Sequence, residues 1–191
     1  MTKSPEEIIE ELATHYRAII ELIGEDPDRE GLKKTPMRAA KALYYATGGY
    51  RENPKEIMRQ AVFEHSGSKI VMVKDIEFYS FCEHHILPFF GNIAIAYIPD
   101  GEIIGLSKLA RVVNTFARRL QVQERLTSEI CKSVAESLST KGVMVMCKAE
   151  HLCMKMRGVE KQESSTVTTD YVGAFESDAT LRQEFYQFVN S

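Results

Sequence analysis

The hydrophobic and polar positions of residues 1–66 follow the period of an α-helix. Ser4-Pro5-Glu6-Glu7 is typical of a capping box with proline in the first turn. Apolar residues then recur at helical spacing: Ile8, Ile9, Leu12, Tyr16, Ile19, Ile20 and Ile23. Gly24 is expected to end this helix, and Thr35-Pro36 and Asn53-Pro54 to begin two more. The first third is therefore predicted to be helical.

The pattern changes after Ser66-Gly67-Ser68, where β-branched and aromatic residues dominate. It predicts strands at 69–79, 90–98, 143–156 and 166–175, and helices from Ser107, at 123–138 and near 181–188. This order is typical of an α+β fold, an antiparallel sheet with helices on one face. We assign residues 1–66 to an N-terminal helical extension and residues 67–191 to the catalytic region of one domain.

Composition and charge narrow the function classes. The chain has 191 residues, of which 44% are hydrophobic, enough for a sizeable core. Its net charge of -3 argues against the broad basic surface of a non-specific nucleic-acid binder. The longest mostly apolar run, 86–98, is too short to span a bilayer, and residues 1–10 carry no secretory signal. We expect a cytoplasmic protein that binds neither nucleic acid nor membrane.

Cysteines and histidines gather in two short segments. Cys82-x-x-His85 can close around one metal ion if the chain turns there, and His151-x-Cys153 shares one face if 143–156 is a strand. Three ligands, Cys82, His85 and Cys153, leave a tetrahedral position open for water, as in catalytic zinc sites. His84 and His151 are then available for acid–base chemistry.

Two alternatives to a catalytic zinc site stay open at this point. One is a closed structural zinc site with His84 or His151 as the fourth ligand. The other is a protein without metal, with buried thiols and surface histidines. Cys131 and Cys147 have apolar neighbours in predicted elements, so we expect them in the core rather than in disulfides.

A second set of residues suits an anion and a purine. Gly105-Leu106-Ser107 leads into a helix N-terminus, and Lys108 and Arg111 follow on its polar face. Glu124 could accept hydrogen bonds from the N1–H and 2-amino group of guanine, and Arg157 could reach a phosphate. The alternatives are a solvated helix face and an acidic residue that favours a helix start.

Taken together, these segments closely resemble the GTP cyclohydrolase I family, from about residue 5 to the C-terminal helix. The matching segments are Gly31-Leu32-Lys33-Lys34-Thr35-Pro36-x-Arg38, Phe81-Cys82-Glu83-His84-His85-Ile86-Leu87-Pro88-Phe89, Gly105-Leu106-Ser107-Lys108-Leu109-Ala110-Arg111, Arg118-Arg119-Leu120-Gln121-Val122-Gln123-Glu124-Arg125-Leu126-Thr127, Glu150-His151-Leu152-Cys153-Met154, and Arg157-Gly158 with Ser164-x-Thr166.

The resemblance implies a tunnelling fold, in which sheets of several subunits join into a barrel. It implies a homodecamer of two pentamers with active sites between subunits, and one Zn²⁺ per subunit. The implied reaction converts GTP and water into formate and 7,8-dihydroneopterin triphosphate, the first step of folate and pterin biosynthesis. Whether a regulatory partner or an allosteric ligand acts on the enzyme stays open.

The resemblance also implies a role for each site residue. Cys82, His85 and Cys153 bind zinc, whose activated water attacks C8 of guanine, while His84 and His151 transfer protons. Glu124, Gln123 and the backbone near Val122 hold guanine. Glu83 lies next to the metal ligands and helps to orient them. The triphosphate is bound by Leu106, Ser107, Lys108, Arg111 and Arg157.

Two rival functions are weighed against this one. A nitrile reductase of the same fold would use a nucleophilic cysteine and NADPH instead of the metal triad. A zinc-binding adaptor would need a closed four-ligand site and a broad basic face, which the net charge of -3 disfavours.

Overall fold

The computed structural model describes residues 3–65, 67, 69–158 and 160–191. The chain forms two compact units, one up to Gly48 and one from Gly49 onward. The first unit holds α1 (Pro5–Leu22) and α2 (Thr35–Ala46), which pack on each other. The predicted capping box is confirmed: Glu7 N donates to Ser4 Oγ at 3.2 Å, and Ser4 N donates to the Glu7 carboxylate at 2.6 Å.

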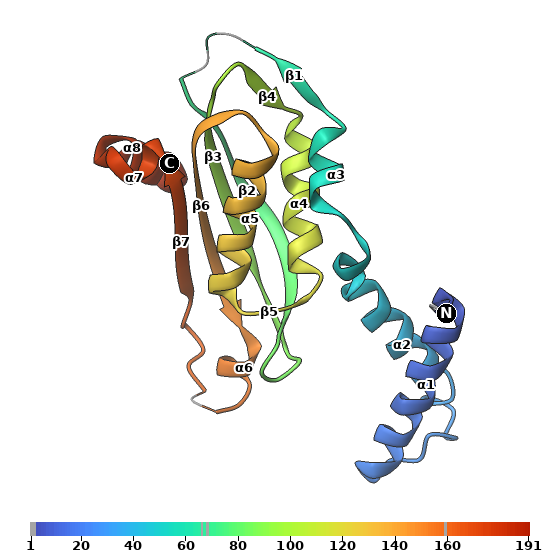
Figure 1. Cartoon of the computed structure of the whole chain (residues 1–191). Coiled ribbons are helices and arrows are strands. Elements are labelled where there is room, and N and C mark those ends of the chain that lie inside the picture. Colours follow the sequence, from blue (N-terminus) through green and yellow to red (C-terminus); the bar gives the residue numbers. More distant parts are fainter. Residues whose placement is uncertain (1–2, 66, 68, 159) are drawn as a thin grey trace. The chain divides into compact units, whose positions relative to one another are not determined.

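The second unit is built on a five-stranded sheet with the order β5-β2-β3-β6-β7 (Figure 1). The long neighbours run antiparallel, whereas the two-residue strand β5 runs parallel to β2, so the sheet is mixed. A separate ribbon pairs β1 with β4. The strands are β1 (Val62–Glu64), β2 (Val71–Cys82), β3 (Pro88–Pro99), β4 (Glu102–Ile104), β5 (Leu120–Gln121), β6 (Thr140–His151) and β7 (Thr166–Gly173).

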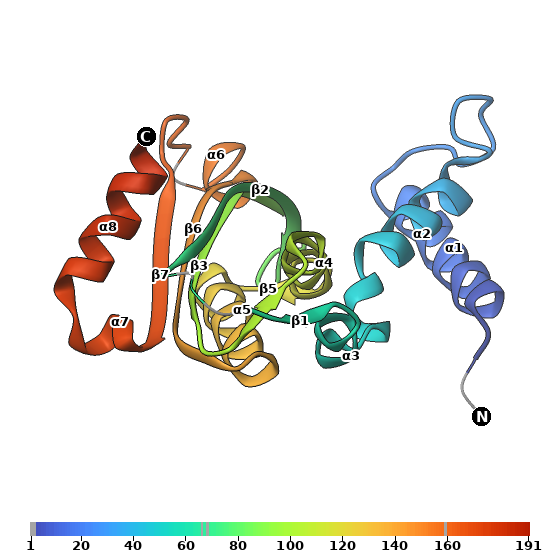
Figure 2. The same cartoon turned by 90° about the horizontal axis from the view of Figure 1, so that it is seen from above.

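Helices cover both faces of this sheet, which corrects the prediction of helices on one face. The helical elements are η1 (Gly48–Arg51), α3 (Pro54–Arg59), α4 (Leu106–Ala117), α5 (Gln123–Ser137), α6 (Leu152–Lys155), α7 (Ala174–Ser177) and α8 (Ala179–Asn190). On one face, α4 and α5 pack Val113 and Ile130 into the main core. On the other face, Phe185 of α8 packs with Ala96 and Met144, and α8 and α5 lie on opposite sides of the strands (Figure 2). Successive residues of a strand face opposite sides of the sheet, and residues 93–97 of β3 are all apolar and buried, so both faces of the sheet are apolar there.

Other boundaries also differ from the sequence pattern. The strand predicted at 143–156 ends at His151, and α4 begins after Gly105, so Ser107 is not its cap. The ribbon of β1 and β4 was not predicted because three-residue strands leave no readable alternation. Helix α3 packs on α4 and α5 and belongs to the second compact unit. Residues 66 and 68 lie outside the described residues. Among those that are described, no helix is long and apolar enough to span a membrane.

Gly91 allows β3 and β6 to approach closely beside the site described below. A Cβ at this position would lie 2.0 Å from Lys148 O, a backbone atom that cannot turn away. Gly91→Ala is therefore expected to lower the free energy of unfolding by about 1–3 kcal/mol or more. Denaturant titration measures this, with Gly105→Ala as the control.

In the control, the added Cβ meets the side-chain methyl of Ala61 at 3.3 Å, and we expect a cost of at most about 1 kcal/mol. Equal free energies of unfolding for the Gly91→Ala and wild-type proteins would contradict the close approach of β3 and β6.

Candidate active site

The turn between β2 and β3 brings His85 back to Cys82. Ile86 N and His85 N both donate to Cys82 O, at 2.8 and 3.3 Å, and Cys82 N donates to Leu87 O at 2.9 Å. Ile86 has a φ of +52°, in the left-handed region that tight turns use. As a result His85 Nδ1 lies 3.9 Å from Cys82 Sγ. The turn that the Cys-x-x-His spacing required is present.

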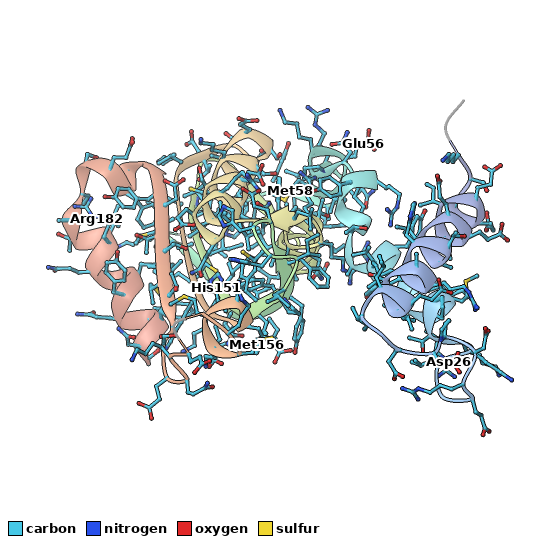
Figure 3. All side chains as sticks on the ribbon, turned by 90° about the horizontal axis from the view of Figure 1, so that it is seen from below. Asp26, Glu56, Met58, His151, Met156 and Arg182 are labelled. Atoms are coloured by element: carbon cyan, nitrogen blue, oxygen red, sulfur yellow. The ribbon has the colours of Figure 1, made fainter. Side chains whose placement is uncertain are left out.

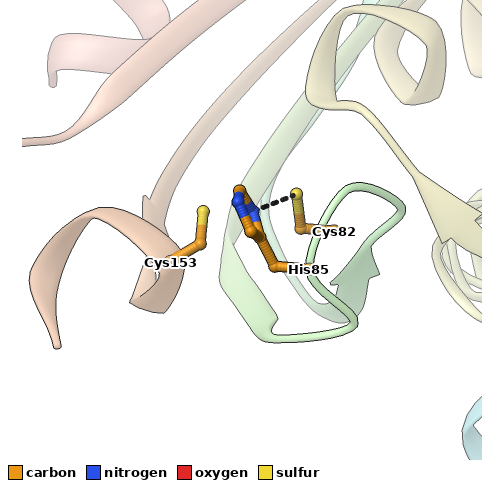
Figure 4. A group of neighbouring side chains, drawn as sticks. All are labelled: Cys82, His85 and Cys153. Atoms are coloured by element: carbon orange, nitrogen blue, oxygen red, sulfur yellow. Dashed lines mark hydrogen bonds between the residues drawn. The ribbon is translucent and has the colours of Figure 1, made fainter. Parts of the chain in front are cut away.

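Cys153 reaches the same place from the other half of the chain. Strand β6 ends at His151, and Cys153 lies in the short helix α6, with its sulfur turned toward Cys82 and His85 (Figure 4). This corrects the sequence argument: His151 and Cys153 do not share a strand face. They meet at the site because the chain bends into α6 between them. Figure 3 labels His151 at the end of β6 and Met156 just beyond α6.

The three side chains fit a metal ion. Their ligand atoms all lie within 4.8 Å of one another, and tetrahedral zinc with ordinary Zn–S and Zn–N bonds needs separations of roughly 3.5–3.8 Å. Within the described part of the chain, no fourth cysteine, histidine or acid joins this group. His84 Nδ1 is also 3.9 Å from Cys82 Sγ, but the side chain is 65% exposed and lies outside the group. The arrangement is thus that of an open site.

The chemistry of the donor set points the same way. Burial and, next, the neighbouring Cys82 thiol raise the pKa of Cys153, and Arg157 opposes this rise. A divalent cation bound here would oppose this rise, because it stabilises a thiolate. Cys131 and Cys147, in contrast, are fully buried free thiols in the main core, as predicted.

A cavity of about 230 Å³ adjoins the three ligands. Its lining comprises Cys82, His84, His85, Gln121, Val122, Gln123, Glu124, His151, Cys153, Met154 and Thr166. His151 is half-buried, its ring is stacked on Phe89 at 4.7 Å, and its Nε2 lies 2.8 Å from Gln123 Oε1. Burial lowers the pKa of His151, while the charge of Glu124 acts against this. The cavity therefore places imidazoles, a carboxylate and a metal-type ligand group around one space.

Three of the cavity residues were assigned no role from the sequence: Gln121, Met154 and Thr166. Phe89, which stacks on His151, was also not assigned a role. The signal that could have found Phe89 is its register, because β3 and β6 pair Phe89 with His151. Such register is a long-range property that one sequence does not display.

The residues predicted to hold the triphosphate are not brought to this cavity by the chain itself. Leu106, Ser107 and Lys108 begin α4, whose first turn lies at the opposite end of the unit from α6 and the β2–β3 turn (Figure 1). Lys108 Nζ donates to Gln60 Oε1 at 2.8 Å. Arg111 lines a separate polar cleft between α3 and α4, together with Arg51 and Arg118. Only Arg157, just beyond α6, lies near Cys153.

Glu83 is not one of the three residues that could hold the metal ion. Its carboxylate forms an ion pair with Arg125, which lowers the pKa of Glu83. Arg125 also donates to Leu120 O at 3.0 Å, and Glu83 N donates to Gln121 O at 3.0 Å. Glu83 thus ties the β2–β3 turn to β5 and the start of α5.

Comparison with known proteins identifies the family. The sequence profile of the GTP cyclohydrolase I family matches residues 12–190. GTP cyclohydrolase 1 of Porphyromonas gingivalis is 54% identical over 184 residues, which cover 96% of this chain and 95% of that protein. GTP cyclohydrolase 1 of Bacteroides fragilis is 54% identical over 181 residues, 95% of this chain and 93% of that protein. Among solved structures, the apo archaeosine synthase QueF-Like aligns with a TM-score of 0.47 and 16% identity, over 57% of this chain and 98% of that one. Profile and relatives agree over nearly the whole length, and the chain belongs to the GTP cyclohydrolase I family.

Proposed function

We propose that this protein is a zinc-dependent GTP cyclohydrolase I. It opens the imidazole ring of guanine in GTP at C8, releases formate and yields 7,8-dihydroneopterin triphosphate for folate or pterin biosynthesis. The observation that carries the proposal is the cavity in which Cys82, His85 and Cys153 converge beside His151 and Glu124. The family membership adds the identity of the substrate.

Cys82, His85 and Cys153 would hold one zinc ion per subunit. Two thiolates and an imidazole favour zinc over the harder divalent cations. Bound there, zinc supplies Lewis acidity, which activates water near neutral pH and polarises the atoms it contacts. The remaining roles fall to side chains of the chain itself.

The other side chains of the cavity bind guanine and transfer protons. Glu124 is exposed at the first turn of α5, where its carboxylate can accept from the N1–H and the 2-amino group, with the backbone at Val122 beside it. His84 and His151 line the same cavity and carry protons to and from the opening ring. Glu83 stiffens the ligand turn through Arg125.

A second copy of the chain would complete the site. The cavity of about 230 Å³ is smaller than the roughly 300–1,000 Å³ of ordinary small-molecule sites. Ser107 and Lys108 lie in the first turn of α4, at the other end of the unit (Figure 1), and Arg111 lines another cleft, so a neighbouring subunit would present these triphosphate residues. The edge strand β7, with Val167 53% exposed, offers unpaired backbone for joining sheets. We propose a tunnelling-fold barrel and a decamer of two pentamers, acting in the cytoplasm.

The direct test of this function is incubation of the zinc-loaded protein with GTP, following formate and the pterin chromophore. Equal amounts of both products are expected. Absence of both, with zinc still bound, would overturn the proposal and favour a binding module.

Glu124→Gln is expected to lower kcat/KM for GTP by about 10²–10³-fold. The amide lacks the second acceptor oxygen, so two charge-assisted hydrogen bonds to guanine are weakened at once. Zinc content should stay unchanged, because Glu124 is outside the ligand group. Glu136→Gln is the matched control on the same helix: its carboxylate forms an exposed ion pair with Lys55, and kcat/KM should match the wild type. An unaltered kcat/KM in Glu124→Gln would remove this residue from guanine recognition.

A further inference from the structure

Gln123 is the most completely engaged polar side chain at the site. It is 2% exposed, and its Nε2 donates to Cys147 O at 3.0 Å, to Thr166 O at 3.0 Å and to Thr168 Oγ1 at 3.2 Å. Two of these three partners are backbone carbonyls, which can only accept. The amide nitrogen therefore has to face β6 and β7, and the orientation of the amide group is settled by its partners.

The oxygen of the same amide group then determines the tautomer of His151. Gln123 Oε1 lies 2.8 Å from His151 Nε2, and an amide oxygen can only accept. The hydrogen of this bond must therefore sit on Nε2. The imidazole is also held in plane, because it stacks on Phe89 with ring centroids 4.7 Å apart and planes 3° from parallel. Phe89 thus fixes the plane of the ring and Gln123 fixes its tautomer. Nδ1 is the ring nitrogen that Gln123 does not contact.

We propose that Gln123 is a positioning residue whose side chain keeps the hydrogen of His151 on Nε2 and so leaves the lone pair of Nδ1 for the reacting ligand. The proposal rests on the proposed function, which it deepens.

This assignment moves the side chain of Gln123 out of guanine recognition. Both amide hydrogens are shared among three protein acceptors, and the oxygen is occupied by His151. A side chain that is 2% exposed and so engaged has no donor to offer a base. Glu124, the next residue, is exposed on the cavity side instead.

The test combines a spectrum with kinetics. In the zinc-loaded protein labelled with ¹⁵N-histidine, solid-state NMR separates the two tautomers, and His151→Asn identifies the His151 signals by their loss. The wild type should show a protonated Nε2 and an unprotonated Nδ1. Gln123→Met should show a mixture of tautomers and a kcat for GTP lower by on the order of 10²-fold, with KM changed less than about 3-fold. Thr168→Val removes one acceptor but keeps both carbonyls, so its His151 tautomer should match the wild type.

Three results would overturn the proposal. They are a wild-type His151 with its hydrogen on Nδ1, an unchanged tautomer in Gln123→Met, and a Gln123→Met protein whose KM rises while kcat holds, as expected of a ligand contact. The first needs no variant, so it decides the matter even if Gln123→Met fails to fold. Since the spectrum needs no substrate, it also judges the role of Gln123 separately from whether the wild type turns over GTP.

Discussion

Cys153→Ala is expected to leave the protein without stoichiometric zinc and to lower GTP turnover by about 10³-fold or more. The change removes one of three protein ligands. The two that remain, Cys82 and His85, both come from the turn between β2 and β3, so the ion would be held from one side alone. Loss of Lewis-acid stabilisation worth several kcal/mol corresponds to that factor in rate. Elemental analysis of zinc per chain and the rate of formate release measure the two effects.

Cys147→Ala is the matched control for this experiment. Cys147 lies on β6, close to the site in sequence, but its thiol is fully buried in the main core, and burial raises its pKa to about 12. The substitution should cost about 1 kcal/mol of stability and leave one zinc per chain. A full equivalent of zinc in Cys153→Ala would refute the ligand assignment.

His84→Ala is expected to retain zinc and to lose about 10²–10⁴-fold in kcat. His84 lines the cavity next to the ligand His85, yet it stands outside the three-residue group and exposes 65% of its side chain. A proton-transfer group in this place contributes to rate rather than to metal affinity. Zinc content and kcat are measured on the same sample, with the exposed His15→Ala of α1 as the control that should change neither. A fully active His84→Ala protein would remove His84 from the chemistry.

Much of the helical structure could be predicted from local signals in the sequence. The capping box at Ser4 predicts the start of α1, and the prolines at 36 and 54 predict α2 and α3. These features act within one turn of helix, so they can be read without knowledge of the rest of the chain. The same holds for Cys82 and His85, whose offset of three residues needs only a turn.

The contacts that could not be predicted from the sequence are those made by long-range pairing of strands and packing of helices. Phe89 meets His151 because β3 and β6 pair in that register, and this pairing also delivers Cys153. Helix α6 replaced the end of a predicted strand, since the apolar residues around Cys153 fit either period over so short a span. The family resemblance assigned Gln123 to guanine, but its side chain is buried, and this burial arises only when α5 packs on β6 and β7.

The cations of α4 are the clearest case of a site that sequence order alone misplaces. Ser107, Lys108 and Arg111 match the family segment, yet within one chain none of them lines the cavity beside Cys82, His85 and Cys153. Lys108 is engaged by Gln60, and Arg111 faces another cleft. Their use in catalysis therefore depends on assembly, which a single chain does not display.

The most direct measurement of the central claim uses GTP labelled with ¹³C at C8 and the protein in zinc-loaded and zinc-stripped forms. We expect one labelled formate per GTP consumed by the zinc-loaded protein, none after removal of zinc, and recovery when zinc is returned. Labelled formate released equally fast by the stripped protein, or a label that stays in the purine while zinc is bound at Cys82, His85 and Cys153, would contradict the account.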